Sequence, residues 1–189
     1  MIIERKAVLR FSPAESVPSA WVRRFAPLLP TAGEVLDVAC GSGRHARLLA
    51  ALGQRVEAVD RDARALAALH GVAGVSLRQA DLETAGWPYG GRLFAGIVVT
   101  NYLFRPGVED LLASLADPGV LIYETFMVGN ERFGRPASPQ YLLQSQEMLG
   151  WVRRPGWQVV AFEEGLTESP RLAMVQRLCA VRGDLVARL

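Results

Sequence analysis

The chain has 189 residues, of which 50% are hydrophobic and 21% are charged, and this balance excludes an intrinsically disordered protein. Its 21 basic and 19 acidic side chains leave a net charge of +2, which is too small to favour nucleic acid or an anionic membrane as a partner. No apolar run approaches the roughly 20 residues of a membrane-spanning helix, and the charged opening MIIERKAVLRF lacks the apolar centre of a signal peptide. We therefore expect a single cytoplasmic domain over residues 1–189.

The first predicted element is a short helix within residues 13–30. Apolar side chains, among them Trp21 and Phe25, recur there at helical spacing, and two prolines close the segment. We interpret residues 1–30 as an N-terminal extension whose helix either joins the core or closes over a site as a lid.

Five apolar runs then alternate with amphipathic stretches. The runs span residues 35–39, 56–60, 75–79, 96–100 and 120–124. The predicted helices span residues 43–53, 62–70, 107–116 and 139–150. Strands and helices in steady alternation are typical of a parallel sheet with helices on both faces.

The alternation of predicted strands and helices stops after residue 150. The runs WQVVAFEEGL (157–166) and RLAMVQRLCAVR (171–182) predict two strands joined by a short turn, and hence an antiparallel hairpin. The predicted fold class is therefore α/β: a Rossmann-like, doubly wound, mostly parallel sheet of seven strands that closes with a C-terminal antiparallel hairpin.

A glycine loop follows the first strand, in VLDVACGSGRHARLLAALG (35–53). Gly41 and Gly43 allow a tight turn and a close approach of a ligand to the backbone, and the next helix directs its free N–H groups at that ligand. The segment from Gly41 to Ala46 matches the GxGxxA dinucleotide pattern. Many parallel sheets need glycine in this turn for backbone geometry alone, so both interpretations stay open.

Acidic residues end the next two strands. Asp60 is placed to bind both hydroxyls of a ribose, whereas Asp62 fits the alternative role of a helix N-cap better. Asp81 follows the third strand, where it can accept the amino group of an adenine while Leu82 packs on the ring. Parallel strands bring their carboxyl ends to one edge, which is where open α/β sheets bind ligands.

Four runs together, VLDVACGSGRHA, VEAVDRD, QADLE and IVVTNYL, resemble the class I S-adenosylmethionine-dependent methyltransferases. The resemblance covers nearly the whole chain, including the closing hairpin. It looks closest to small bacterial members of the tellurite-resistance and thiopurine methyltransferase type. The chain departs from the family pattern at Ala39, where the first loop glycine is usual, and at Ala95 or Gly96, where an Asp commonly precedes the fourth strand.

The resemblance implies S-adenosylmethionine as cofactor and S-adenosylhomocysteine as product. Around the methionine part of the cofactor it implies Asp37, Ala39, Cys40, Gly41 and Gly43. It further implies that Asp60 holds the ribose and that Arg61 covers the adenine. Asp81 and Leu82 complete the adenine pocket, and Asn101 lies beneath the sulfonium. Charge complementarity agrees, because Arg44 is a suitable partner for the cofactor carboxylate.

Methyl transfer requires alignment more than acid–base chemistry, so a soft acceptor such as a thiol or metalloid needs little help from a base. The catalytic candidates are Tyr102, which alternatively packs on the cofactor, and Glu124, which alternatively caps a loop. In the loop 126–139, Arg132 and Arg135 flank Phe133 and suit an anionic or aromatic substrate, unless these side chains lie in water.

We expect a small-molecule acceptor, since TNYLF lacks both prolines of the motif that acts on nucleic-acid amino groups. No metal is expected, because no His, Cys and Asp side chains cluster in the sequence. The sequence does not indicate an oligomeric state. Two alternatives remain: a S-adenosylmethionine-binding regulatory protein without turnover, and a nicotinamide-dependent oxidoreductase. Asp37 opposes the second, because a carboxylate beside the loop would repel a pyrophosphate.

Overall fold

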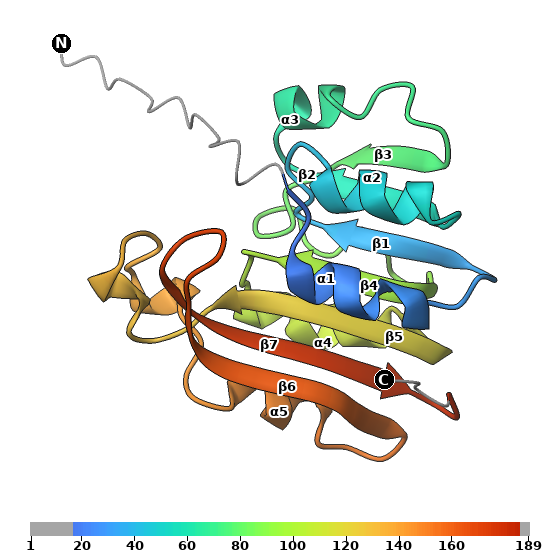
Figure 1. Cartoon of the computed structure of the whole chain (residues 1–189). Coiled ribbons are helices and arrows are strands. Elements are labelled where there is room, and N and C mark those ends of the chain that lie inside the picture. The colour runs from blue at the N-terminus through green and yellow to red at the C-terminus, as the bar shows by residue number, and fades with distance from the viewer. Residues whose placement is uncertain (1–16, 186–189) are drawn as a thin grey trace, which may run out of the picture.

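The computed structural model describes residues 17–185, which form one seven-stranded sheet with helices on both faces (Figure 1). The strands are β1 (Glu34–Val38), β2 (Arg55–Asp60), β3 (Val75–Gln79), β4 (Phe94–Thr100), β5 (Leu115–Phe126), β6 (Trp157–Thr167) and β7 (Ala173–Arg182). Their order is β3-β2-β1-β4-β5-β7-β6. Strands β1 to β5 pair in parallel, and β7 is antiparallel to both β5 and β6. The predicted fold class, including the closing hairpin, is confirmed.

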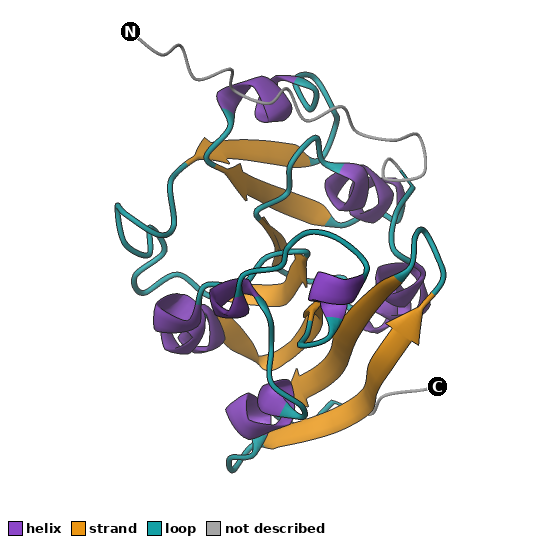
Figure 2. Cartoon of the chain, turned by 90° about the vertical axis from the view of Figure 1, so that its left-hand side faces the viewer, coloured by secondary structure: helices purple, strands orange, loops and turns teal. Residues whose placement is uncertain are grey.

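Five α-helices cover the sheet. They are α1 (Ala20–Phe25), α2 (Arg44–Ala51), α3 (Ala63–Ala67), α4 (Val108–Ala113) and α5 (Glu147–Val152). Short 3-10 turns are η2 (Ala26–Leu28), η3 (Arg105–Gly107), η4 (Asn130–Arg132) and η5 (Pro139–Tyr141). Figure 2 looks onto the carboxyl ends of β1 to β5, which point to the left in Figure 1.

The apolar side chains of the central strands alternate between two cores. Along β4, Ile97 and Val99 join the core beneath α4 and α5, whereas Val98 joins the core beneath α1, α2 and α3. All three are fully buried. Burial on both faces explains why these strands read as continuous apolar runs in the sequence.

The helix α1 belongs to the core. Ser19 caps its start by accepting the backbone N–H of Trp21 at 3.1 Å, and Trp21 and Phe25 are both buried. The Trp21 indole N–H donates to the carbonyl of Leu178 on β7 at 3.2 Å. Core packing thus accounts for both aromatic residues. The lid interpretation of residues 1–30 stays a prediction, and residues 1–16 lie outside the described part.

His45 joins the start of α1 to the sheet. Its Nε2 accepts the backbone N–H of Ser19 at 3.1 Å, and its Nδ1 lies 3.3 Å from the Thr100 hydroxyl. Because Nε2 is the acceptor, we assign the proton to Nδ1, which donates to Thr100. Burial and the charge of Arg44 lower the pKa of His45 to about 3, so the ring is neutral. This histidine therefore positions α1 beside the carboxyl end of β4.

The structure corrects three predicted helices, of which the one expected over 62–70 ends at Ala67. The helix expected over 139–150 is instead the turn η5, an extended segment and the later helix α5. The Arg105 side chain holds this segment in its non-helical course. It donates to the carbonyls of Gln140 and Leu142 and forms a bidentate ion pair with Glu147. The helix expected over 107–116 ends at Ala113, because the next strand already begins at Leu115.

Within residues 17–185, the helices are all too short or too polar to cross a membrane.

Candidate functional site

Three adjoining cavities lie along the carboxyl ends of the strands. The first cavity has a volume of about 130 Å³, the second about 250 Å³ and the third about 500 Å³. The first and second share Arg61, Glu83 and Tyr102. The second and third share Asn101 and Phe126. The three cavities therefore form a continuous cleft at the edge where the sequence predicts the ligand.

The β1–α2 loop bends sharply beside this cleft. Ala39, Gly41 and Gly43 have φ angles of 51°, 56° and 79°, which lie in the left-handed region. A Cβ atom on Gly43 would lie 2.3 Å from the buried Leu69 side chain, whereas one on Gly41 would enter open space. The left-handed backbone favours glycine at both positions, and contact of either glycine with a ligand stays a prediction. Gly43 is required by packing, and Gly41 leaves room above the loop.

Asp60 closes the same loop from β2. Its Oδ2 accepts the Gly41 N–H at 2.8 Å, and its Oδ1 accepts the Asp62 N–H at 2.9 Å. Asp62 in turn accepts the N–H groups of Arg64 and Ala65, which confirms it as the N-cap of α3. Asp60 also lines the first cavity. It therefore fixes the loop and presents its carboxylate to the cleft at the same time.

The first cavity gathers the four residues predicted for a nucleoside, together with Ala39, which was predicted beside the methionine part. Its lining includes Ala39, Asp60, Arg61, Asp81 and Leu82. The Asp81 Oδ1 accepts the N–H groups of Glu83 at 3.0 Å and Thr84 at 3.3 Å. These hydrogen bonds lower the pKa of Asp81 and keep it ionised at neutral pH. Sequence reasoning missed Glu83, which lines both the first and second cavities.

A buried carboxylate lies at the base of the loop. Asp37 on β1 is 1% exposed, and its Oδ2 has no hydrogen-bond partner among the described residues. Burial raises the pKa of Asp37 to about 7, although the Ala46 N–H and the nearby Arg44 charge oppose the rise. Arg44 itself lines the third cavity. A buried carboxylate with one oxygen lacking a hydrogen-bond partner is stabilised by a cation that binds nearby.

Cys40 is held inside the loop. It is buried, its N–H donates to the Val59 carbonyl at 3.0 Å, and its thiol lies 3.6 Å from the Gly41 carbonyl. Burial raises the pKa of this thiol well above its usual range. A thiol that stays protonated is a poor nucleophile, so Cys40 supports the loop in this structure.

Asn101 and Tyr102 follow β4 at the centre of the cleft. Asn101 has a φ of 56°, its N–H donates to the Glu124 carbonyl at 2.9 Å, and it lines the second and third cavities. The Tyr102 hydroxyl is buried without a hydrogen-bond partner among the described residues. Burial raises its pKa, so the phenol stays protonated and can donate a hydrogen bond.

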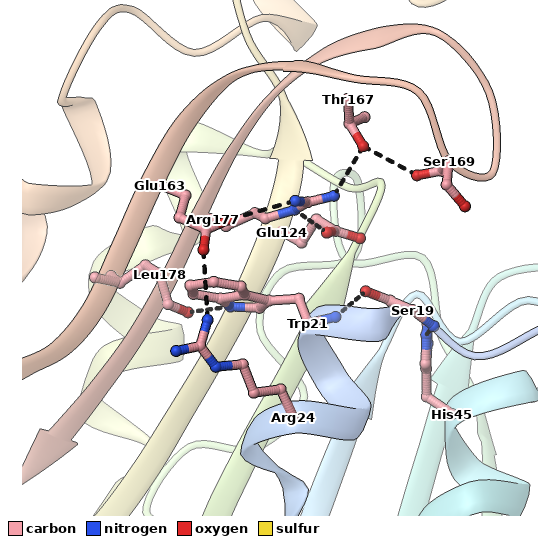
Figure 3. A network of polar contacts seen from close by, with 10 residues as sticks. All are labelled: Ser19, Trp21, Arg24, His45, Glu124, Glu163, Thr167, Ser169, Arg177 and Leu178. Carbon is pink, nitrogen blue, oxygen red and sulfur yellow. Dashed lines mark hydrogen bonds and ion pairs between the residues drawn. The ribbon is translucent and has the colours of Figure 1, made fainter. Parts of the chain in front are cut away.

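Glu124 lines the third cavity, and its carboxylate forms an ion pair with Arg177 of β7 at 2.5 Å (Figure 3). Arg177 also donates to Glu163 at 3.4 Å and to the Thr167 hydroxyl at 3.3 Å. The carboxylate of Glu124 is therefore already engaged by a cation. Its catalytic role stays a prediction.

The three residues predicted for substrate contact lie on the surface. Arg132, Phe133 and Arg135 are exposed, and the Arg132 guanidinium lies 5.7 Å from the centre of the Phe133 ring. Their loop instead contributes Pro136 to the second cavity, and Tyr141 of the following turn η5 also lines it. Contact of Arg132, Phe133 and Arg135 with a substrate therefore stays a prediction.

Among residues 17–185, no three His, Cys, Asp or Glu side chains gather in a group that could hold a metal ion.

Comparisons with known proteins find similarity to methyltransferases. Residues 35–117 match the model of a methyltransferase domain. A protein-L-isoaspartate O-methyltransferase of Chlorobaculum tepidum is 34% identical over 108 residues, which cover 53% of this chain and 48% of the relative. The chain thus matches about half the length of that relative.

Solved structures show the same fold at low sequence identity. TehB from Haemophilus influenzae has a TM-score of 0.69 and 17% identity, over 87% of this chain and 61% of that chain. A S-adenosylmethionine-dependent methyltransferase from Mesorhizobium loti has a TM-score of 0.64 and 18% identity, over 86% of this chain and 98% of that chain. The glycopeptide N-methyltransferase MtfA, in complex with S-adenosylhomocysteine, has a TM-score of 0.61 and 18% identity, over 85% of this chain and 88% of that chain.

The two loop glycines make a matched pair for mutation. Gly41→Ala and Gly43→Ala each place a side chain in the left-handed region, at a cost of about 1–2 kcal/mol. Gly43→Ala also collides with Leu69, which adds about 1–3 kcal/mol of overpacking. We expect urea unfolding to show the larger loss of stability for Gly43→Ala. Equal losses would contradict the assignment of Gly43 to packing and of Gly41 to open space.

Proposed function

We propose that this chain is a class I methyltransferase that binds S-adenosylmethionine in the cleft and transfers its methyl group to a small molecule. The observation that carries the proposal is the gathering of predicted nucleoside contacts around the first cavity. They come from three successive strand ends, which the topology places side by side.

The nucleoside end of the cofactor fits the first cavity. Each Asp60 oxygen accepts one backbone N–H, which leaves lone pairs for the two hydroxyls of a ribose. Asp81 supplies an ionised acceptor for the adenine amino group, and Leu82 supplies an apolar surface for the ring. Arg61 lines the same cavity and can cover the ring from the solvent side.

The methionine end fits the residues around the loop. The buried Asp37 carboxylate, whose Oδ2 lacks a hydrogen-bond partner among the described residues, attracts an ammonium group, while Arg44 attracts a carboxylate. Gly41 leaves open space for the aliphatic part of the cofactor's methionine, which would lie between these two charges. Asn101, at the junction of the second and third cavities, presents a side-chain oxygen where a sulfonium charge needs a partner.

When bound, the cofactor supplies an electrophilic methyl group on a sulfonium. The protein's own part is to align an acceptor with that methyl group, which can lower the barrier by roughly 7–11 kcal/mol. Tyr102 stays protonated and therefore serves as a hydrogen-bond donor rather than a base. Glu124 is held by Arg177. We therefore propose a soft acceptor, a thiol or a metalloid, which needs no strong base.

Calorimetry tests the cofactor. S-adenosylhomocysteine should bind with a Kd of about micromolar size, because the cleft supplies partners for both its ends, whereas NAD should bind at least about 100-fold more weakly. Asp37 beside the loop disfavours a pyrophosphate. NAD as the tighter ligand would contradict the proposal.

Turnover is tested with a labelled methyl donor that is offered together with thiols, metalloid oxyanions, amines and carboxylates. Cofactor binding without transfer to any of them would support the regulatory alternative.

Substitutions of Asp60 and Asp62 distinguish a specific contact with the ribose from a general effect of negative charge near the cofactor. Asp60→Ala removes the acceptor of two expected ribose hydrogen bonds and should cost about 2–4 kcal/mol of S-adenosylhomocysteine affinity. Asp62→Ala removes the same charge two residues away but should cost mainly about 1 kcal/mol of capping stability. Titrating S-adenosylhomocysteine into both variants measures the contrast. Equal losses of affinity would mean that Asp60 acts only through its charge.

A further inference from the structure

The third cavity extends the cleft beyond the cofactor residues. It is the largest of the three, at about 500 Å³, and such a volume suits a small organic ligand. Its walls come from the segment before and within α1, the ends of β4 and β5, and the β6–β7 turn. It meets the cofactor residues at Arg44 and Asn101. A molecule in this cavity therefore lies next to the position that we propose for the sulfonium.

The lining of this cavity is basic. Arg23, Arg44, Arg171 and Arg177 line it, against a single acidic residue, Glu124. The protein as a whole carries a net charge of only +2, so this concentration of arginine is local. Clefts lined by one sign of charge raise the local concentration of ligands of the opposite sign.

Two of these arginines are not neutralised by a carboxylate. Among residues 17–185, neither Arg23 nor Arg171 forms an ion pair. The Arg171 guanidinium donates to the Arg135 carbonyl at 3.1 Å and lies 5.4 Å from the centre of the Phe126 ring. Carbonyl and ring contacts orient a guanidinium without cancelling its charge. A carboxylate suits the remaining donors of such a group.

Arg177 forms a fixed part of the same wall (Figure 3). Glu124, Glu163 and the Thr167 hydroxyl hold its guanidinium, and Thr167 also donates to the Ser169 carbonyl at 3.1 Å in the β6–β7 turn. These contacts neutralise Glu124, the one acidic residue among the described residues of the lining, and anchor the turn that carries Arg171. The cavity therefore keeps its positive charge although a carboxylate lies in its wall.

Apolar groups complete the cavity. Phe126, Ala173 and Val175 line it beside the arginines, and all three are buried. The combination of an apolar floor and a basic rim favours a ligand with an anionic group on an apolar body. Arg132 and Arg135, the arginines predicted for this purpose, lie on the exposed loop outside this lining.

We propose that the methyl acceptor is a small organic anion, whose carboxylate or equivalent oxyanion group is bound by Arg23 and Arg171 at the rim of the third cavity. This inference rests on the proposed methyltransferase function and, of the two soft acceptors proposed there, favours an organic thiol over a metalloid. The oxyanion is a recognition handle and does not react. The acceptor's nucleophile lies at the other end of the molecule, toward Asn101.

The test begins with S-adenosylhomocysteine binding, which reports on the proposed function alone. Binding of matched acid and amide probes then follows on the same protein, with and without S-adenosylhomocysteine. The probes are 3-phenylpropionate, 3-mercaptopropionate and benzoate, each against its primary amide. We expect at least one acid to bind about tenfold or more tightly than its amide. If no acid binds more tightly than its amide, the proposal is wrong, whether or not S-adenosylhomocysteine binds.

Substitutions of single arginines test where the anionic group of the probe binds. Arg23→Gln and Arg171→Gln should each weaken the preferred acid about fivefold or more, without changing the affinity of its amide or of S-adenosylhomocysteine. Arg153→Gln removes the same charge from an exposed residue after α5, outside this cavity, and is the matched control. An undiminished preference for the acid in both cavity variants would overturn the proposal. A loss caused by Arg132→Gln instead would assign the anion to the exposed loop and would also overturn it.

Discussion

Burying a carboxylate without a full set of partners is costly, and β1 carries such a carboxylate at Asp37, directly before the loop that bends around the cleft. The raised pKa of about 7 expresses that cost. Because the pKa is higher in the folded chain than its usual value near 4, Asp37 makes the free protein less stable as the pH rises from about 4 to about 7. A cation bound beside Asp37 removes this penalty. The arrangement of the cleft is therefore best explained by a ligand with a positive charge at this point.

The other parts of the cleft are built around this loop by contacts from distant segments. Asp60 on β2 holds the Gly41 N–H, and Cys40 donates to Val59, so β2 fixes the course of the chain above Asp37. On the opposite side, neutral His45 ties Ser19 to Thr100 and so positions α1 beside the third cavity. The cofactor end and the proposed acceptor end are thus set by hydrogen bonds within the rigid sheet and its first helices, which favours a preformed site.

Much of this architecture could be predicted from the sequence, because it depends on local patterns. The apolar runs fixed the strands, and the parallel order then brought Asp60 and Asp81 to one edge. The left-handed φ of Ala39 also explains why glycine is usual at that loop position. Helix ends near residue 140 could not be predicted, since they depend on Arg105, which lies about 40 residues away in the chain.

The third cavity, with its basic lining, could not be predicted from the sequence either. Arg23 lies far from Arg171 and Arg177 in the chain, and the packing of α1 together with the pairing of β7 with β5 brings them to one cavity. In that pairing Glu124 lies opposite Arg177, and this register could have suggested their ion pair once the strand order was known. Arg132 and Arg135 were predicted to contact a substrate because they flank Phe133 in the sequence, although the structure leaves them exposed.

The pH dependence of S-adenosylhomocysteine binding tests the role of Asp37 most directly. A bound ammonium group lowers the pKa of Asp37 from about 7, so binding releases a proton below that pH and affinity rises as the pH increases. The account predicts about a tenfold gain in affinity between pH 6 and pH 8, which Asp37→Asn abolishes while it weakens binding at pH 8. Calorimetry of both proteins over this range measures it. An unchanged pH profile in Asp37→Asn would contradict the account.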